Sequence, residues 1–400
     1  MTILDQFRGA GPLRDLTVLD FSQMMMGPVA TQLMGDLGAL VVKVERPVVG
    51  EWERSYLPQG RRVAGESPYF LAMNRNKIGL AADLKDPADL QRLLDLVPHV
   101  DAVVHNYRPG VMERLGLGFE ALRALNPALV YASGSGFGTA GPWVTRPGQD
   151  LLVQSASGLA ADSGPSGIPP VPSATPVVDA STGFLLAFAV VSGVLEARST
   201  GTGREIEASL LGTALLMQCQ QALVTLNTDL RYERAASGIA APWTDAPYGV
   251  HPTADGYITL SMVAPEKLAA VLDVPDSLLG LDPAAVFTVR DAIVAAIRPQ
   301  LLARTTEEWL SVMAEHDIWA APLLTLEEAL AHPQVTDNGF VEDFQAPDGS
   351  TVAGIGMAVR ISGVEKADRL PPPRIGQHTD LVWQAVADAA GRTGSEDPRG

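Results

Sequence analysis

The chain has 400 residues, of which 46% are hydrophobic and 19% charged, so it is long enough to bury a large core and is not a disordered polypeptide. Its net charge of −17 argues against nucleic acid as a partner, and a single cysteine excludes a disulfide framework. The longest apolar run, FLLAFAVVSGVL, is shorter than the roughly 20 residues that span a bilayer. We therefore expect a cytoplasmic protein that binds neither membranes nor nucleic acids.

Strand and helix patterns alternate in the first half of the chain. Near-continuous apolar runs predict buried strands over residues 16–22, 40–46, 101–107 and 129–135. Helical patterns lie between them over residues 28–37, 87–97 and 119–126. Repeated βαβ units of this kind predict an α/β fold, with a mainly parallel sheet that carries helices on both faces.

The second half changes in composition. Residues 142–180 are rich in Pro, Gly and Ser, which is typical of a long loop that serves a site or an interface. A long apolar helix is predicted over about residues 182–198, followed by a strand in GREIEASL and a helix in LGTALLMQCQQALVTL. A second change in composition, over 231–247, suggests a crossing linker to a smaller α+β domain, and the last ten or so residues are expected to be mobile.

One glycine motif is misleading. Residues 136–141 satisfy G-x-G-x-x-G after a predicted strand, but Pro142 and Pro147 follow and no helix pattern begins there. A dinucleotide site needs that helix, because its amino terminus binds the pyrophosphate. The six histidines show no metal-ligand spacing, and no G-x-S-x-G nucleophile motif is present. We expect no metal, redox cofactor or serine hydrolase chemistry.

Two carboxylates are candidates for the chemistry. Asp150 and Asp179 each stand at the head of an apolar stretch, where aspartate often caps a helix. Asp179 also has apolar neighbours, which would make it a partly desolvated nucleophile. A carboxylate of this kind attacks an acyl thioester to give a mixed anhydride. Capping and catalysis both remain open at this point.

Ordered motifs along nearly the whole chain resemble the class III CoA-transferases, which include formyl-CoA transferase, carnitine CoA-transferase and the related α-methylacyl-CoA racemases. The motifs are VLDFSQMMMGPVATQLMGDLGALVVKVERP, NRNK, ADLKDP, HNYRPGVMERLGLGFEALRALNPALVYASGSGFG, PGQD, VVDASTGF, STGTGREIEASL, APLLTLEEALAHPQV and LPPPRIGQHTD.

The resemblance implies an interlocked homodimer with a Rossmann-like large domain over residues 1–225, a small α+β domain over 226–327, and a segment over 328–400 that returns to the large domain. It implies CoA transfer from an acyl-CoA to a carboxylic acid, with CoA as substrate and no permanently bound cofactor. Asp179 would form the acyl anhydride and then a thioester with CoA, and Asp150 would position or protonate the substrate.

The same resemblance implies a CoA site, and its basic members fall in residues 43–114, where acidic and basic residues are nearly balanced in number. Its members are Met24, Met25, Met26, Arg46, Leu84, Lys85, Asn106, Tyr107 and Arg114.

The chain departs from the family pattern at several positions. Relatives that act on formate and oxalate carry a glutamine where this chain has Met25, and the racemases carry a histidine where it has Gln149. No histidine lies between 106 and 250, although racemisation needs two bases. His105 replaces the glutamate that usually precedes the Asn-aromatic pair. A racemase or epimerase, and a CoA-binding paralogue without activity, remain the alternatives.

Overall fold

A computed structural model of the chain describes residues 2–364 and 370–393. The chain divides into two compact units. The first comprises Met1–Val153, Pro176–Thr213 and Gln334–Gly400, and the second comprises Gln154–Thr175 and Ala214–Pro333. The boundaries expected at residues 225 and 327 stay a prediction, and most of the tail expected to be mobile lies outside the described residues.

A six-stranded parallel sheet forms the centre of the first unit, in the order β3-β2-β1-β4-β5-β6. This is the strand order of a doubly wound α/β fold, and it confirms the predicted fold class. Its strands are β1 (Thr17–Asp20), β2 (Leu40–Glu45), β3 (Lys77–Ala81), β4 (Ala102–His105), β5 (Val130–Ser135) and β6 (Glu205–Ser209).

Alternate strand residues enter two separate apolar cores. Leu19, Val42 and Val103 belong to one core, while Val18 and Val41 belong to the other. Both faces are therefore buried, which explains the near-continuous apolar runs of the strands. The helices of this unit are α1 (Met26–Asp36), α2 (Pro68–Met73), α3 (Pro87–Leu96), α4 (Val111–Arg114), α5 (Phe119–Leu125), α7 (Val177–Thr200) and α16 (Thr379–Thr393), with 3-10 turns η1 (Thr2–Phe7), η2 (Trp52–Arg54), η3 (Pro58–Gly60) and η4 (Val97–His99).

Sequence reasoning missed strand β3. Its residues KIGLA are short, begin with a lysine and contain a glycine, so they lack the apolar run of the other strands. Gly79 is needed because a Cβ there would lie 2.8 Å from the Arg374 carbonyl oxygen and 2.9 Å from Pro373 Cβ. Lys77 is stable in a buried position because its ammonium group donates to the Asp20 carboxylate, the Pro28 carbonyl and the Asn74 side chain.

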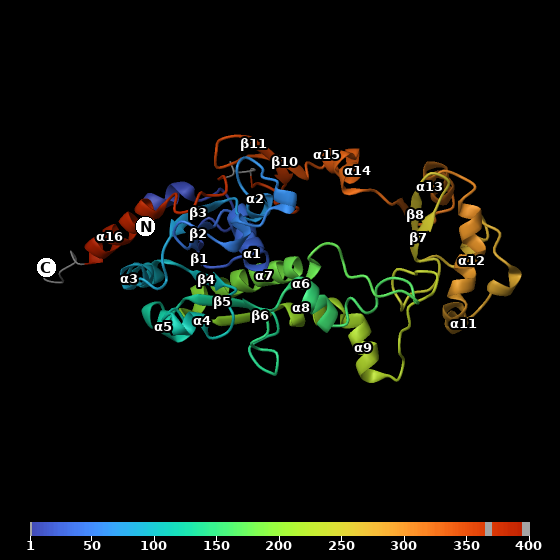
Figure 1. Ribbon diagram of the computed structural model, residues 1–400, viewed down its shortest axis with the longest axis horizontal. Coiled ribbons are helices and arrows are strands. Elements are labelled where there is room, and N and C mark those ends of the chain that lie inside the picture. The colour runs from blue at the N-terminus through green and yellow to red at the C-terminus, as the bar shows by residue number, and fades with distance from the viewer. Residues whose placement is uncertain (1, 365–369, 394–400) are drawn as a thin grey trace. The chain divides into compact units, whose positions relative to one another are not determined.

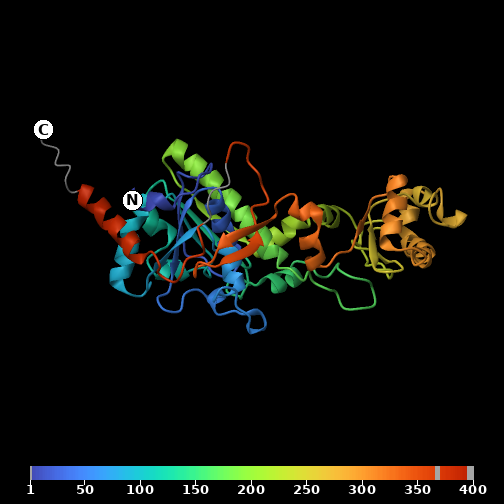
Figure 2. The ribbon, with the colours of Figure 1, turned by 90° about the horizontal axis from the view of Figure 1, so that it is seen from above.

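The C-terminal segment belongs to this same unit. Helix α16 lies beside η1 (Figure 1, Figure 2). The rings of Phe7 in η1 and His378, directly before α16, are 5.0 Å apart. The His378 Nδ1 accepts a hydrogen bond from the backbone of Gly79, and the Thr379 hydroxyl accepts one from Ala81. The segment also supplies a hairpin of β10 (Val341–Gln345) and β11 (Thr351–Ile355).

The second unit has its own core, built around a small antiparallel sheet. Its strands are β7 (Gly249–Pro252), β8 (Tyr257–Leu260) and β9 (Ala320–Pro322). Its helices are α9 (Cys219–Asn227), α10 (Pro265–Leu268), α11 (Pro283–Thr288), α12 (Arg290–Leu301), α13 (Thr306–Glu315) and α14 (Leu326–Ala331), with η5 (Asp276–Leu278). Helices α6 (Asp150–Ala156), α8 (Leu210–Met217) and α15 (Pro333–Thr336) cross the boundaries of the units.

The long apolar helix is present as α7. It packs against α1 and the sheet, and one turn after Asp179 a Cβ on Gly183 would lie only 2.7 Å from the Met26 carbonyl oxygen. By length and composition α7 is also able to cross a bilayer, a test that core helices of soluble proteins pass as well. The glycines of 136–141 precede no helix, since α6 begins only at Asp150, and Gly136 instead passes closely against Gly148.

Candidate active site

The carboxyl ends of the parallel strands gather most of the predicted site residues. Met24, Met25 and Met26 follow β1, Arg46 follows β2, Leu84 and Lys85 follow β3, and Asn106 and Tyr107 follow β4. The strand order reverses between β1 and β4, and open α/β sheets bind their ligands at such a switch point. The topology therefore brings these residues to one edge of the sheet.

The turn after β1 is held by its neighbours. The Asn106 side chain donates to the Gln23 carbonyl at 2.6 Å and accepts from the Gln23 amide at 2.9 Å. Met24 has a positive φ of 64°, which is uncommon for a residue with a side chain. The Glu51 carboxylate accepts a hydrogen bond from the Met24 amide at 3.1 Å, so this strained turn has a fixed partner.

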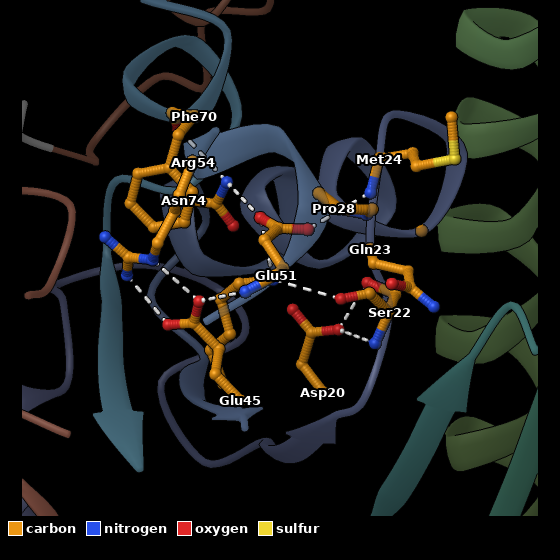
Figure 3. A network of polar contacts seen from close by, with 12 residues as sticks. Asp20, Ser22, Gln23, Met24, Pro28, Glu45, Glu51, Arg54, Phe70 and Asn74 are labelled. Carbon is orange, nitrogen blue, oxygen red and sulfur yellow. Dashed lines mark hydrogen bonds and ion pairs between the residues drawn. The ribbon is translucent and has the colours of Figure 1, made fainter. Parts of the chain in front are cut away.

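A buried network of charges lies beneath that turn (Figure 3). Lys43 donates to the Ser22 carbonyl at 3.0 Å and pairs with Glu51 at 3.3 Å. The Asp20 carboxylate accepts from Lys77 at 3.1 Å and from the Thr31 hydroxyl at 2.7 Å. Because buried charges are stable only when they are paired, the network fixes the backbone of the turn from below.

A second pair closes the network on the side of β2 (Figure 3). Arg54 binds the Glu45 carboxylate with two bonds of 2.7 Å, donates to the Pro373 carbonyl at 2.8 Å, and lies 3.6 Å above the centre of the Phe70 ring. Two-point binding of this type adds geometric precision to charge pairing. It fixes η2, the turn that contains Glu53.

Asp150 and Asp179 meet at the amino end of α7. The Asp150 carboxylate accepts hydrogen bonds from the backbone amides of Val178 at 2.7 Å and Asp179 at 2.9 Å. It thus satisfies two of the amides that have no partner within the helix. Asp150 is buried and Asp179 is partly buried. Asp150 therefore caps α7, although in the sequence it is the first residue of a different helix, α6.

The Asp179 carboxylate is left free. Within residues 2–364 and 370–393 it has no hydrogen-bond or ion-pair partner. Burial, together with the nearby Asp150 carboxylate, raises the pKa of Asp179 to about 7. Desolvation and a like charge both disfavour ionisation. The result is a partly exposed carboxylate with a raised pKa and no hydrogen-bond partner among the described residues. These are the properties of a nucleophile or a general base.

The predicted CoA-binding residues differ in their surroundings. Met26 is buried against β5, where a Cβ on Gly134 would lie 2.5 Å from its Cε, so it packs in the core. Met24 is 38% exposed, and Leu84 packs at the rim of a core. The charges of Lys43 and Arg46 lower the pKa of Tyr107, but burial outweighs them and raises it.

The remaining cations are exposed. Arg46 and Lys85 lie at the sheet edge, and Arg114 is in α4 with its guanidinium close to Gly110. No interaction among the described residues joins Lys85 or Arg114 to the two carboxylates. The roles of all nine residues in CoA binding therefore stay predictions.

His105 is buried beside the Tyr131 ring, with the two centroids 5.1 Å apart. Neither ring nitrogen has a hydrogen-bond partner in the described part of the chain, and burial lowers the pKa of His105 to about 4. The imidazole is therefore neutral near pH 7.

Two groups at this edge escaped the sequence analysis. The charged network could not be predicted, because Lys43, Glu45 and Lys77 lie in strands whose sequence pattern indicates burial but not which charges pair. Glu53 is buried in η2, and its charge interacts unfavourably with those of Glu51 and Asp179. Its sequence context, EWERSY, contains no motif, and only the fold reveals the proximity.

A separate cavity of about 690 Å³ lies in the first unit, and no predicted site residue lines it. Its walls include the ends of α1 and η1, at the opposite edge of the sheet from the two carboxylates. Among the described residues, no group of three or more His, Cys, Asp or Glu is arranged to hold a metal ion.

Comparisons with known proteins place the chain in a family. The model of CoA-transferase family III matches residues 13–379. An acyl-CoA transferase of Fusarium pseudograminearum is 33% identical over 94% of this chain and 85% of its own length. The succinyl-CoA:glutarate CoA-transferase of Mus musculus is 32% identical over 94% of this chain and 86% of its own. A crystal structure of a CAIB/BAIF family protein from Brucella suis covers 94% of this chain and 100% of its own, with a TM-score of 0.81 and 28% identity.

Proposed function

Because the chain belongs to CoA-transferase family III and is a CoA-transferase, we propose that it moves CoA from an acyl-CoA to a carboxylic acid through covalent intermediates on Asp179. The observation that carries this proposal is the free, partly desolvated carboxylate at the amino end of α7. A carboxylate with a pKa near 7 is about half ionised at neutral pH and more nucleophilic than an ordinary aspartate.

The reaction balances in four steps. The Asp179 carboxylate attacks the thioester carbonyl, the C–S bond breaks, and a mixed anhydride and CoA thiolate result. The thiolate then attacks the Asp179 carbonyl, which releases the first acid as its carboxylate and leaves a CoA thioester on Asp179. The acceptor carboxylate attacks this thioester and displaces the thiolate again. Attack of the thiolate on the acceptor acyl carbon completes the transfer and restores the Asp179 carboxylate.

The binding of CoA is proposed for the same sheet edge. Arg46, Lys85 and Arg114 are exposed cations suited to phosphate groups, and Arg46 lies near Tyr107. The exposed part of the methionine turn would contact the pantetheine chain, with Leu84 and Asn106 beside it. A nucleotide tail at this position would direct the thioester toward the start of α7.

We further propose that the protein is a homodimer that works in the cytoplasm. The outward face of α7 supports a partner: Phe188 is 71% and Leu195 is 73% exposed, and Phe184 lies on the same face. Contiguous exposed apolar groups of this kind mark interfaces. Phe188→Glu should then produce monomers in sedimentation, whereas a monomeric wild type would contradict the dimer.

The substrates are tested with a panel. Succinyl-CoA, acetyl-CoA and a long-chain acyl-CoA are each incubated with glutarate, oxalate and a fatty acid, and new thioesters are identified by mass spectrometry. Transfer with at least one pair is expected. Loss of an α-proton to deuterated water without any acceptor would support the racemase alternative instead. Binding of CoA with neither reaction would support a CoA-binding paralogue.

A further inference from the structure

Glu53 occupies a turn that is fixed on both sides. It is the middle residue of η2, which follows β2 at the carboxyl edge of the sheet. Before it, Glu51 is held by Lys43 and by the Met24 amide. After it, Arg54 is held by two bonds to Glu45. The position of Glu53 is therefore imposed by buried ion pairs on either side.

Its side chain is buried but incompletely bonded. Glu53 is only 7% exposed, and its Oε2 has no hydrogen-bond partner in the part of the chain that the structure describes. The charged groups that act on it electrostatically are Glu51, Asp179 and Lys43, so negative charges predominate. Burial, then Glu51 and Asp179, raise the pKa of Glu53 to about 7. Burying an unpaired carboxylate is costly, and holding a proton removes that cost.

The structure also connects Glu53 with the nucleophile. Asp179 lies one turn before Gly183, which touches Met26 in the turn after β1. The same turn is bonded through Met24 to Glu51, two residues before Glu53. The carboxyl groups of Glu53 and Asp179 interact electrostatically, and neither has its oxygens fully used. Two such neighbours do not readily ionise together, so one of them keeps a proton.

We propose that Glu53 is a third carboxyl group of the reaction site, which keeps a proton and donates a hydrogen bond to the carboxylate of the acceptor acid as this acid approaches the CoA thioester on Asp179. This inference rests on the proposed function. The proton stays on Glu53 throughout, so the stoichiometry of the transfer does not change.

The need for such a donor follows from the charges. An acceptor acid is an anion, and it must approach a site that already contains the Asp150 carboxylate. The ammonium group of Lys43 is occupied by the Ser22 carbonyl and by Glu51. A neutral carboxylic acid is therefore the group in η2 that is able to receive the anion. This role predicts a larger effect on the acceptor than on the acyl-CoA.

The experiment compares E53Q and E53A with wild type, and uses E120Q as a control because Glu120 is an exposed residue paired with Arg123. For the most active pair of the panel, kcat/KM for the acceptor is measured from about pH 5 to about pH 9. Wild type should lose activity above about pH 7, where Glu53 ionises and stops donating. E53Q should keep activity there, because its amide donates at every pH, and E53A should fall about 10- to 100-fold throughout.

A second measurement needs no substrate. Infrared spectra are recorded near pH 6, and the spectrum of each variant is subtracted from that of wild type. The wild type minus E53Q difference should contain the C=O band of a protonated carboxylic acid, and the wild type minus E120Q difference should not. Absence of that band from the difference, or an E53Q pH profile identical to wild type, would overturn the role of Glu53. If hydroxylamine captures no adduct on Asp179 in wild type, the proposed function itself fails, so the two failures are distinguishable.

Discussion

The Asp150 carboxylate accepts a hydrogen bond from the backbone amide of Asp179, with 2.9 Å between the oxygen and the nitrogen. One of the two acids thus satisfies the amino end of α7, while the other is left with its oxygens free. Because Asp150 occupies these amides, they do not stabilise the charge of Asp179, and the pKa of Asp179 stays high. Capping, one of the two roles open for both residues, is thus filled by Asp150 at α7, and the catalytic roles of both carboxylates stay proposals.

Asp150→Asn and Asp150→Ala should separate charge from capping. Asparagine keeps an oxygen that accepts the amide hydrogens but removes the like charge, so the pKa of Asp179 should fall and the rising limb of the pH–rate profile should move to lower pH. Alanine should additionally reduce the free energy of unfolding by about 1 kcal/mol. An asparagine variant with an unmoved rising limb would contradict the electrostatic coupling.

Asp179→Asn should raise stability at high pH. The folded-state pKa of about 7 lies above the ordinary value of 3.8, so the folded protein binds this proton more tightly than the unfolded chain does. That contribution is full below about pH 4 and is lost as the pH rises through about 7. The asparagine variant should thus melt above wild type at about pH 8 and show no such gain near pH 4. A pH-independent difference in Tm would contradict the assignment.

Gly183→Ala should disturb the position of the nucleophile. A Cβ there would lie 2.7 Å from the Met26 carbonyl, which is backbone and gives way poorly, so we expect a loss of about 1–3 kcal/mol and lower turnover. Gly193→Ala, in the same helix, is the matched control. Its Cβ would be 3.1 Å from the Ile206 side chain, which is able to move. The free energy of unfolding in denaturant and kcat are measured for both variants. Equal losses in the two variants would contradict a specific role for the close contact at Gly183.

Arg46→Ala and Lys85→Ala test the binding of CoA. Loss of one phosphate contact should raise KM for the acyl-CoA about tenfold, with little change in kcat, and should weaken the salt dependence of KM. Arg123→Ala removes another exposed arginine, one paired with Glu120, and should leave KM unchanged. If all three variants behave alike, the proposed CoA site at the sheet edge is wrong.

The sequence predicted the apolar parts of this fold well. Strands β1, β2, β4 and β5 were predicted because their residues are buried on both faces of the sheet and read as continuous apolar runs. Strand β3 was missed, since the buried ammonium group of Lys77 depends on the Asp20 carboxylate, 57 positions away, together with the Pro28 carbonyl and the Asn74 side chain. A long-range ion pair leaves no local pattern.

The candidate site was predicted in the same uneven way. Asp150 and Asp179 stand in recognisable motifs and indeed lie together. Glu53 does not, because its burial depends on the ion pairs that its neighbours Glu51 and Arg54 make with Lys43 and Glu45 of β2. The sequence also could not predict that the Asp179 carboxylate has no partner among the described residues. That follows from the fold, in which Asp150 and not Asp179 accepts the amides at the start of α7.

The central claim is tested most directly by trapping the intermediate. Wild type and Asp179→Asn are incubated with succinyl-CoA, acetyl-CoA or a long-chain acyl-CoA, and hydroxylamine is added before peptide mass spectrometry. We predict a hydroxamate on Asp179 in wild type with at least one donor, and none in the variant. A wild-type Asp179 peptide that stays unmodified while CoA is transferred, or an adduct on another residue, would contradict the account.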